Sequence, residues 1–528
     1  MFNKKFIWSL VLMATSGLVA GQQAPENWFN LDKKSNKVLG VSTEKAYSQL
    51  LQDKTSVTVI VGVLDSGVDE DHEDLKNVMW INDDEIPGNG IDDDKNGYVD
   101  DIYGWNFIGG KDGKNVSVDS YELTRVYKKL KEKYENMTEA TMTAEEKEGY
   151  LDFLKLKVDF LQKSTLAKQR FEDLSKAMKR FENIEKAIGK GENITAEDLK
   201  NYKPVNSKEA DIVQRIITYL QAGEKYSDIK ANTKGAYDHY DKEANYAYNI
   251  DFNSRLIVGD NYEDQNEKYY GNNDVTGPDA SHGTHVAGII AAQRDNNLGV
   301  KGVANNAKIM SVRCVPDGDE RDKDVANAIR YAVDNGAKVI NMSFGKAFPW
   351  NKAIVDEAVK YAESKDVLLV HGAGNDAKDI DININYPNPN IATDKTRASN
   401  WVEVGASSWV DKKGRLAVFS NYGKINVDVF APGVAIYSTI PGSKYASFDG
   451  TSMASPCTAG VAALIRSYFP DLTAAQVRMI LMKSTTKVKG KVYLPGGKKI
   501  TKLKKICISG GVVNAYKAIQ MADKLSKY

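Results

Sequence analysis

Three residues of complementary chemistry stand in short, distinctive stretches of this chain: Ser452, His282 and Asp65. Ser452 lies in residues 450–456, Gly-Thr-Ser-Met-Ala-Ser-Pro, just before the apolar, helix-like run 459–465. A serine in the first turn of a helix sits beside unpaired backbone N–H groups, so an oxyanion formed there would meet oriented donors. The same pattern also suits an ordinary N-cap serine before a buried helix. A nucleophilic role therefore requires a base and a group that orients it.

His282 and Asp65 are the residues that could meet this requirement. His282 begins residues 282–288, His-Gly-Thr-His-Val-Ala-Gly, and is one of only five histidines. A serine hydroxyl becomes a good nucleophile when a base takes its proton, and histidine titrates near neutrality. Asp65 follows the β-branched run 57–64, which is typical of a buried parallel strand. At the carboxyl end of that strand, Asp65 would fix the imidazole tautomer and stabilise the imidazolium.

The elements that must position these residues alternate along the chain. Alternating strands and helices predict a parallel sheet that is covered on both faces. We expect strands over 307–313, 339–343 and 367–372, and helices over 286–292, 324–335, 353–364 and 514–524. His371 stands near the end of one strand, where it would either line a cleft or make a buried hydrogen bond; the second role is more common for histidine.

At these motifs the sequence resembles the subtilisin-like serine proteases, the subtilases. The motifs occur in the family's order of Asp, His and Ser. The matching stretches are 63–68 (Val-Leu-Asp-Ser-Gly-Val), 282–288, 450–456 and 372–375 (Gly-Ala-Gly-Asn), and the resemblance covers about 40–110 and 250–525. It implies an α/β fold, a subtilisin-like three-layer sandwich with a mainly parallel central sheet.

The resemblance also implies the site and its chemistry. Ser452 would attack the scissile carbonyl, and Asn375 would stabilise the oxyanion with the Ser452 N–H. An extended protein or peptide substrate would lie between two backbone segments, with no cofactor in catalysis. These segments are Ser343, Phe344 and Gly345, and Gly372, Ala373 and Gly374. A silent binding protein on the same scaffold, or an oligomer-forming protein, is the alternative; the intact set of four residues argues against the first.

Composition and the N-terminus indicate an exported globular protein. The 528 residues are 42% hydrophobic with zero formal net charge, so neither nucleic acid nor an anionic membrane is an obvious partner. Lys4 and Lys5 precede a short apolar stretch that ends in small residues, as in a secretory signal peptide at 1–21. We expect export to a periplasm or the cell exterior without a stable membrane anchor. Three cysteines exclude a disulfide scaffold.

A long insertion separates Asp65 from His282, because the gap between them far exceeds the few tens of residues usual in the family. Apolar residues recur at helical spacing within it, as in Leu151, Leu154, Val158 and Leu161. The insertion would serve as a lid, a substrate-recognition arm or an oligomerisation element, or it is a surface excursion that covers its own apolar stripe. The expected organisation is an N-terminal segment at 22–56, the family domain at 57–111 and 251–528, and the helical insertion at 112–250.

An acidic stretch follows the Asp65 strand, with fourteen acidic residues and two lysines between positions 65 and 101. Asp92, Asp94 and Asn96 have the Asp-x-Asp-x-Asn-Gly spacing of a calcium loop, in which the Tyr98 carbonyl would be a further ligand. Asp100 or Asp101 would complete the ligands. Hard oxygen ligands without Cys or His favour calcium over zinc. A loop rich in Asx turns that binds no ion is the alternative. We predict a structural Ca²⁺.

Overall fold

The computed structural model describes residues 24–138, 142–410 and 412–527. The chain divides into two compact units. The helical unit contains Leu123–Phe252, and the sheet unit contains Gln23–Glu122 and Asn253–Tyr528. The expected signal peptide lies outside the described residues. No described helix is both long and apolar enough to cross a membrane.

The sheet unit is built on a central sheet, in which nine strands pair among the described residues. Their order is β12-β15-β9-β8-β5-β4-β1-β3-β2, and all neighbours are parallel except β12 and β15. The strands are rich in Val, Ile and Leu because both faces are buried. Their bounds are β1 Val59–Asp65, β2 Gly104–Asn106, β3 Ala307–Arg313, β4 Val339–Met342, β5 Leu368–Gly372, β8 Trp401–Ser407, β9 Val429–Pro432, β12 Thr486–Lys487 and β15 Gly511–Val512.

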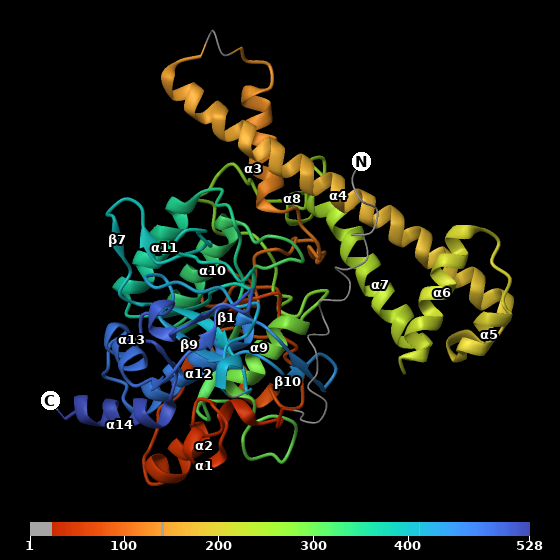
Figure 1. The fold of residues 1–528 in the computed structure, drawn as a ribbon. Coiled ribbons are helices and arrows are strands. Elements are labelled where there is room, and N and C mark those ends of the chain that lie inside the picture. Colours follow the sequence, from red (N-terminus) through yellow and green to blue (C-terminus); the bar gives the residue numbers. More distant parts are fainter. Residues whose placement is uncertain (1–23, 139–141, 411, 528) are drawn as a thin grey trace. The chain divides into compact units, whose positions relative to one another are not determined.

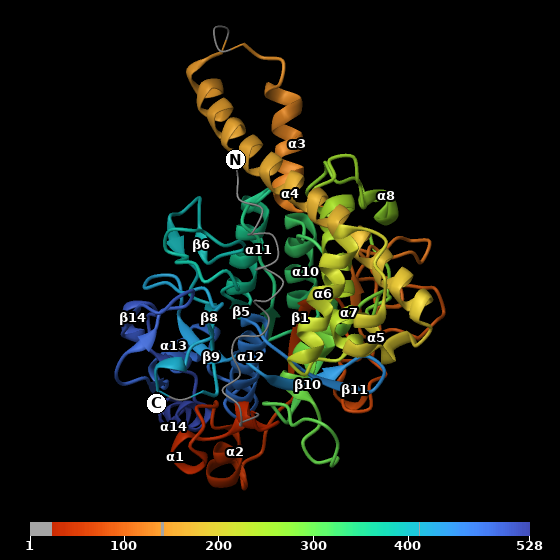
Figure 2. The same cartoon turned by 45° about the vertical axis from the view of Figure 1, so that its right-hand side comes forward.

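Helices cover both faces of this sheet (Figure 1, Figure 2). One face, with Val61 and Val370, packs against α9 (Ser281–Ala291), α12 (Thr451–Tyr468), α13 (Ala474–Lys483) and α14 (Ala515–Leu525). The opposite face, with Leu64 and Leu369, packs against α10 (Asp322–Asp334) and α11 (Lys352–Ser364). Successive strand residues thus enter different cores. The expected three-layer α/β sandwich with a mainly parallel sheet is confirmed.

Most predicted elements agree with the structure to within two residues, but the helix around His282 does not. It was predicted over 286–292, yet α9 begins at Ser281, which places His282 in its first turn. Glycine is a poor helix former, so Gly283 and Gly288 concealed this start. Packing requires Gly283, since a Cβ there would lie 2.1 Å from the carbonyl oxygen of Gly67, two residues after Asp65.

The segment before β1 belongs to the core of the sheet unit. It contains the short helices α1 (Lys33–Asn36) and α2 (Thr43–Ala46). Trp28 and Phe29 are fully buried in the core that α12 and α14 share. The Trp28 indole N–H lies 3.1 Å from the carbonyl oxygens of both Val434 and Ala435. These few apolar residues in a polar stretch therefore hold residues 24–56 in place.

Short antiparallel hairpins and one further helix complete the sheet unit. The hairpin that leads into α12 is formed by β10 and β11, which pair from Ile436 opposite Phe448 to Ile440 opposite Lys444. The bounds are β6 Asn390–Ile391, β7 Thr396–Arg397, β10 Ile436–Ile440, β11 Lys444–Phe448, β13 Val492–Tyr493, β14 Ile500–Thr501 and α8 Arg255–Val258.

The helical unit is organised along one 45-residue helix, α4 (Ala144–Ile188). A capping box of Thr143 and Glu146 starts it, and Gly189, with φ of 73°, ends it. Its second half shares an apolar core with α6 and α7. The other bounds are α3 Glu122–Tyr134, α5 Ala196–Asn201, α6 Ser207–Gln221 and α7 Tyr226–Lys242.

The apolar stripe predicted in the first half of α4 is helical but not buried. Leu151, Leu154, Val158 and Leu161 are all exposed. The buried apolar residues there are Phe153 and Phe160, whose rings stack on Tyr127 of α3. Aromatic residues, rather than the leucines at regular spacing, make this contact.

Candidate active site

His282 and Asp65 form a hydrogen-bonded pair. Asp65 ends β1 and is 2% exposed, and its Oδ1 lies 2.6 Å from His282 Nδ1. The Ser66 backbone N–H also donates to this oxygen, at 2.8 Å. Burial alone would lower the pKa of His282, but the charge and hydrogen bond of Asp65 outweigh it and raise the pKa above its ordinary value. Because Nδ1 is engaged by Asp65, Nε2 is the imidazole nitrogen that is left for another partner, and the ring is half-exposed.

Ser452 lies in the first turn of α12, as predicted, and contacts the segment after β4. Its Oγ donates to the Ser343 carbonyl oxygen at 3.1 Å, and Ser343 Oγ donates to the Ser452 carbonyl oxygen at 2.9 Å. Leu64 is opposite Met342 in the sheet, so Asp65 and Ser343 leave neighbouring strands side by side. The carboxyl edge thus brings Ser452 toward the Asp65–His282 pair. Among the described residues, no hydrogen bond joins His282 to Ser452.

Asn375 is held against the residue before Ser452. Its Oδ1 accepts from the Thr451 N–H at 2.9 Å and from the Thr451 hydroxyl at 3.1 Å. The Gly374 N–H donates to the same hydroxyl at 3.0 Å. Because the carbonyl end of the amide is anchored, its NH₂ group is the end left for a ligand, and Asn375 is exposed.

The two predicted substrate segments leave adjacent strands. Ser343, Phe344 and Gly345 follow β4, while Gly372 ends β5 and is followed by Ala373 and Gly374. Met342 pairs with His371, so the segments begin side by side. Sequence reasoning missed Asn385, whose side chain lies near both Gly345 and Gly374. It stands in a loop with no motif, and only proximity in space reveals it.

His371 makes the buried hydrogen bond rather than lining a cleft. Its Nδ1 lies 2.9 Å from Glu403 Oε1, and the Trp401 indole N–H donates to Glu403 Oε2 at 2.8 Å. Burial opposes protonation of His371, but the Glu403 carboxylate raises the histidine pKa above its ordinary value.

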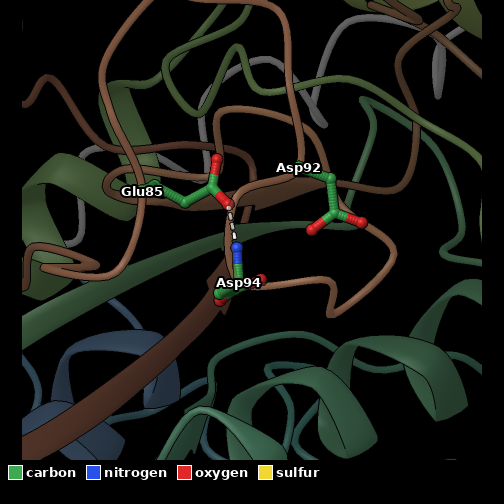
Figure 3. Close-up of side chains that lie close together, drawn as sticks. All are labelled: Glu85, Asp92 and Asp94. Carbon is green, nitrogen blue, oxygen red and sulfur yellow. Dashed lines mark hydrogen bonds between the residues drawn. The ribbon is translucent and has the colours of Figure 1, made fainter.

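The acidic loop brings carboxylates together in part as expected (Figure 3). Ligand atoms of Glu85, Asp92 and Asp94 all lie within 4.8 Å of one another. Glu85, which the loop motif did not include, also accepts from the backbone N–H groups of Asp94 and Asp100. These backbone hydrogen bonds stabilise the turns of the loop itself, so the grouping of the carboxylates does not by itself require an ion.

The remaining predicted ligands have other partners. Asn96 Oδ1 accepts from the Tyr98 N–H at 2.8 Å. Both carboxylate oxygens of Asp100 accept from backbone N–H groups in the turn of Gly88, Asn89 and Gly90. Asp100 therefore stabilises that turn, and it is not part of the three-carboxylate group.

Comparison with known proteins identifies the family. The profile of the subtilase family matches residues 56–497, and the chain belongs to this family. A thermophilic serine proteinase from Bacillus sp. (strain AK1) is 41% identical over 211 residues, which are 40% of this chain and 48% of the relative. Subtilisin BL from Lederbergia lenta is 40% identical over 206 residues, 39% of this chain and 70% of that protein. The match thus spans about half of the first relative's length.

Among solved structures, a protease from Pseudoalteromonas arctica aligns with a TM-score of 0.39 and 30% identity. The alignment covers 48% of this chain and 78% of that one.

Proposed function

We propose that this protein is an exported serine endopeptidase that hydrolyses peptide bonds through an acyl-enzyme. The observation that carries the proposal is the 2.6 Å contact between Asp65 and His282 at the sheet edge that also holds Ser452 and Asn375. Nucleophilic catalysis by serine needs a base, a group that orients the base, and donors for the oxyanion. Family membership supports each assignment.

The proposed reaction starts when the Ser452 hydroxyl turns from the Ser343 carbonyl toward His282 Nε2. Such contacts commonly tighten only once substrate is bound. Ser452 Oγ then bonds to the scissile carbonyl carbon while His282 takes its proton. The Asn375 NH₂ and the Ser452 N–H stabilise the oxyanion. Collapse expels the amine with the proton from His282, and water hydrolyses the acyl-enzyme by the same steps.

We further propose that the substrate is an extended protein or peptide chain between the segments after β4 and β5. Main-chain hydrogen bonds would supply affinity, and side-chain pockets would supply selectivity. The expected signal peptide supports export to a periplasm or the cell exterior. For the helical unit we propose substrate recognition or oligomerisation, supported by the exposed stripe of Leu151, Leu154, Val158 and Leu161.

The decisive experiment is digestion of a peptide library by the mature protein beside a Ser452→Ala control. We expect cleavage only by the unmutated protein, together with covalent labelling of Ser452 by a fluorophosphonate. A correctly folded protein that neither cleaves nor labels would instead be a binding protein on the same scaffold.

For the acidic loop we propose a structural Ca²⁺ held by Asp92, Asp94, Asn96, the Tyr98 carbonyl and Asp100. Glu85 fits this set because its carboxylate lies within 4.8 Å of both aspartates and supplies a further hard oxygen. An ion there would offset the repulsion among these carboxylates. Asp100 is the weakest member, since it already caps the Gly88–Gly90 turn.

The test is thermal unfolding of the Ser452→Ala protein with calcium or chelator. At a hundredfold excess over its dissociation constant, calcium should stabilise the fold by about 2.7 kcal/mol. Asp92→Ala with Asp94→Ala should abolish the shift, whereas Asp83→Ala with Asp84→Ala, which removes equal charge from exposed neighbours, should retain it. Equal shifts in both double variants would place the ion elsewhere.

A further inference from the structure

The last part of the sheet unit carries an uneven share of the charge. Residues 472–522 contain ten lysines, one arginine and no acidic residue, although the whole chain has as many acidic as basic side chains. The zero net charge of the protein therefore conceals one strongly basic stretch. Like charges at this density repel one another unless an anionic partner neutralises them.

The hairpin of β13 and β14 lies within this stretch and has two different faces. Val492 pairs with Thr501, and Tyr493 pairs with Ile500, in antiparallel register. Val492 is fully buried and belongs to the apolar core beneath the hairpin. Because side chains alternate between the faces of a strand, Tyr493 and Ile500 lie on the outer face, where they are 41% and 40% exposed.

Lysines extend this outer face along both strands. Lys491 stands two residues before Tyr493, and Lys502 stands two residues after Ile500. The backbone of Lys502 is still extended, with φ of −94° and ψ of 137°, so the alternation continues to it. Both lysines are exposed and therefore lie beside the apolar pair on the outer face.

Further lysines stand at the turn of the hairpin and beside the tyrosine. Lys498 and Lys499 are exposed in the turn between the two strands. Lys413 Nζ, from another loop, lies 5.9 Å from the centroid of the Tyr493 ring. Among the residues that the structure describes, none of these three lysines, nor Lys491 or Lys502, forms an ion pair. The outer face thus combines two apolar side chains with a border of unneutralised cations.

The composition of this face fits a lipid surface better than a protein partner. Protein interfaces are enriched in arginine and depleted in lysine, whereas ten of the eleven cations of residues 472–522 are lysines. A lysine ammonium is a point charge that needs no fixed bidentate geometry, so it suits a fluid layer of phosphate headgroups. Tyrosine is typical of the level at which headgroups meet acyl chains.

We propose that the outer face of the β13–β14 hairpin binds the surface of an anionic lipid bilayer. Tyr493 and Ile500 would enter the headgroup layer, while the surrounding lysines contact lipid phosphates. Such binding is peripheral and reversible, so it requires no membrane anchor. It goes beyond the proposed peptidase activity and does not depend on it.

The test measures the partition of the mature Ser452→Ala protein onto lipid vesicles by cosedimentation. Residues 1–21 are left out because the expected signal peptide would itself bind lipid. Vesicles of equal parts phosphatidylglycerol and phosphatidylcholine should bind the protein, and vesicles of phosphatidylcholine alone should not. Binding should fall as the salt concentration rises, because salt screens the attraction between exposed charges and the headgroups.

Two double variants test the two components of the face. Lys491→Glu with Lys502→Glu should weaken partitioning by at least about thirtyfold, because each lysine near an anionic bilayer contributes roughly a factor of five. Tyr493→Thr with Ile500→Thr should weaken it by about tenfold through lost apolar burial, and threonine keeps the strand propensity of the hairpin.

A charge-matched control separates this face from the general charge of the protein. Lys301→Glu with Lys338→Glu makes the same change in charge at exposed lysines outside residues 472–522 and should bind as the unmutated protein does. Equal losses in the two lysine variants, or no binding to the phosphatidylglycerol vesicles, would overturn the proposal. Unchanged partitioning of the threonine variant would also overturn it, because the face would then bind charge alone, as a site for a soluble polyanion does.

Discussion

Among the described residues of the sheet unit, two histidine–carboxylate pairs differ in access rather than in chemistry. His282 pairs with Asp65 and His371 pairs with Glu403, at 2.6 and 2.9 Å. In both, a carboxylate raises the histidine pKa against the effect of burial. The side chain of His282 is 39% exposed, whereas that of His371 is 0% exposed. A pair can act as a base only if its second nitrogen reaches a substrate, so exposure separates a catalytic candidate from a structural pair.

The largest effect should come from the exposed pair. His282→Ala should lower kcat by on the order of a millionfold, the loss known for the histidine of subtilisin, with little change in unfolding free energy. Single-turnover hydrolysis of a peptide substrate and chemical denaturation measure the two quantities. Retention of activity within tenfold would assign the base to another residue.

The next effect concerns the amide beside the nucleophile, which is exposed like His282. Asn375→Ala should reduce kcat by about two to three orders of magnitude with a small change in KM, because an oxyanion donor acts on the transition state. Steady-state kinetics across a range of substrate concentrations distinguish the two constants. A higher KM with unchanged kcat would instead make Asn375 a substrate-binding residue.

The buried pair should behave in the opposite way. His371→Gln leaves the Glu403 charge without its cation, and breaking a buried pair typically costs about 3–5 kcal/mol of folding stability. The folded fraction should retain turnover within about tenfold. Denaturation with urea measures the folding stability, and active-site titration by a fluorophosphonate gives the amount of active protein to which turnover is referred. If His371→Gln were stable but lost as much activity as His282→Ala, the assignment of His371 to a structural pair would be wrong.

The smallest effects are changes with pH, and the two pairs should affect different quantities. The His282 pair should set the pH dependence of activity, and the His371 pair should set the pH dependence of folding stability. His282 must be neutral to act as a base, so its raised pKa places the acid limb of kcat/KM above pH 6.5, and activity increases as the pH rises through that pKa. Asp65→Asn should move the limb to lower pH. A limb below pH 6.5 in the unmutated protein would contradict the pairing.

For His371 the quantity to measure is the free energy of unfolding as a function of pH. A raised pKa in the folded state contributes stability that is complete below the unfolded pKa of about 6.5 and is lost as the pH rises through the folded value. The destabilisation caused by His371→Gln should therefore be larger at pH 6 than at pH 9. Unfolding free energies of both proteins at these two pH values supply the check.

The sequence predicted those parts of the molecule that follow from local pattern. The β-branched run before Asp65 became β1, the strand predicted over 307–313 became β3, and the apolar stretch after Ser452 became part of α12. Spacing also placed Asp92 and Asp94 together. Local pattern failed where packing overrode propensity. The first turn of α9 contains Gly283, a poor helix former that is required because a Cβ there would meet a backbone carbonyl. In the first part of α4, Phe153 and Phe160 are buried instead of the regularly spaced leucines.

Contacts between distant segments could not be predicted, because no local pattern in the sequence indicates them. Glu85 joins the acidic group from outside the loop motif, and Asn385 lies beside Gly345 although it belongs to a separate loop rich in Asn and Pro. Neither residue belongs to a periodic stretch, and each is defined by the backbone of another segment. The roles proposed for Asp65, His282 and Ser452 rest on the family motifs and their order along the chain, and hydrophobic periodicity alone would not have indicated them.

The burial of Trp28 has a consequence for how the chain assembles. Its indole bonds to Val434 and Ala435, more than 400 positions later, and the Ala515 N–H donates to the carbonyl oxygen of Val41. Segments more than 400 positions apart must therefore meet, and closing such long loops is slow. Helix α12, which carries Ser452, joins the same core. The core that holds Ser452 therefore cannot be completed before the chain has been synthesised as far as Ala515.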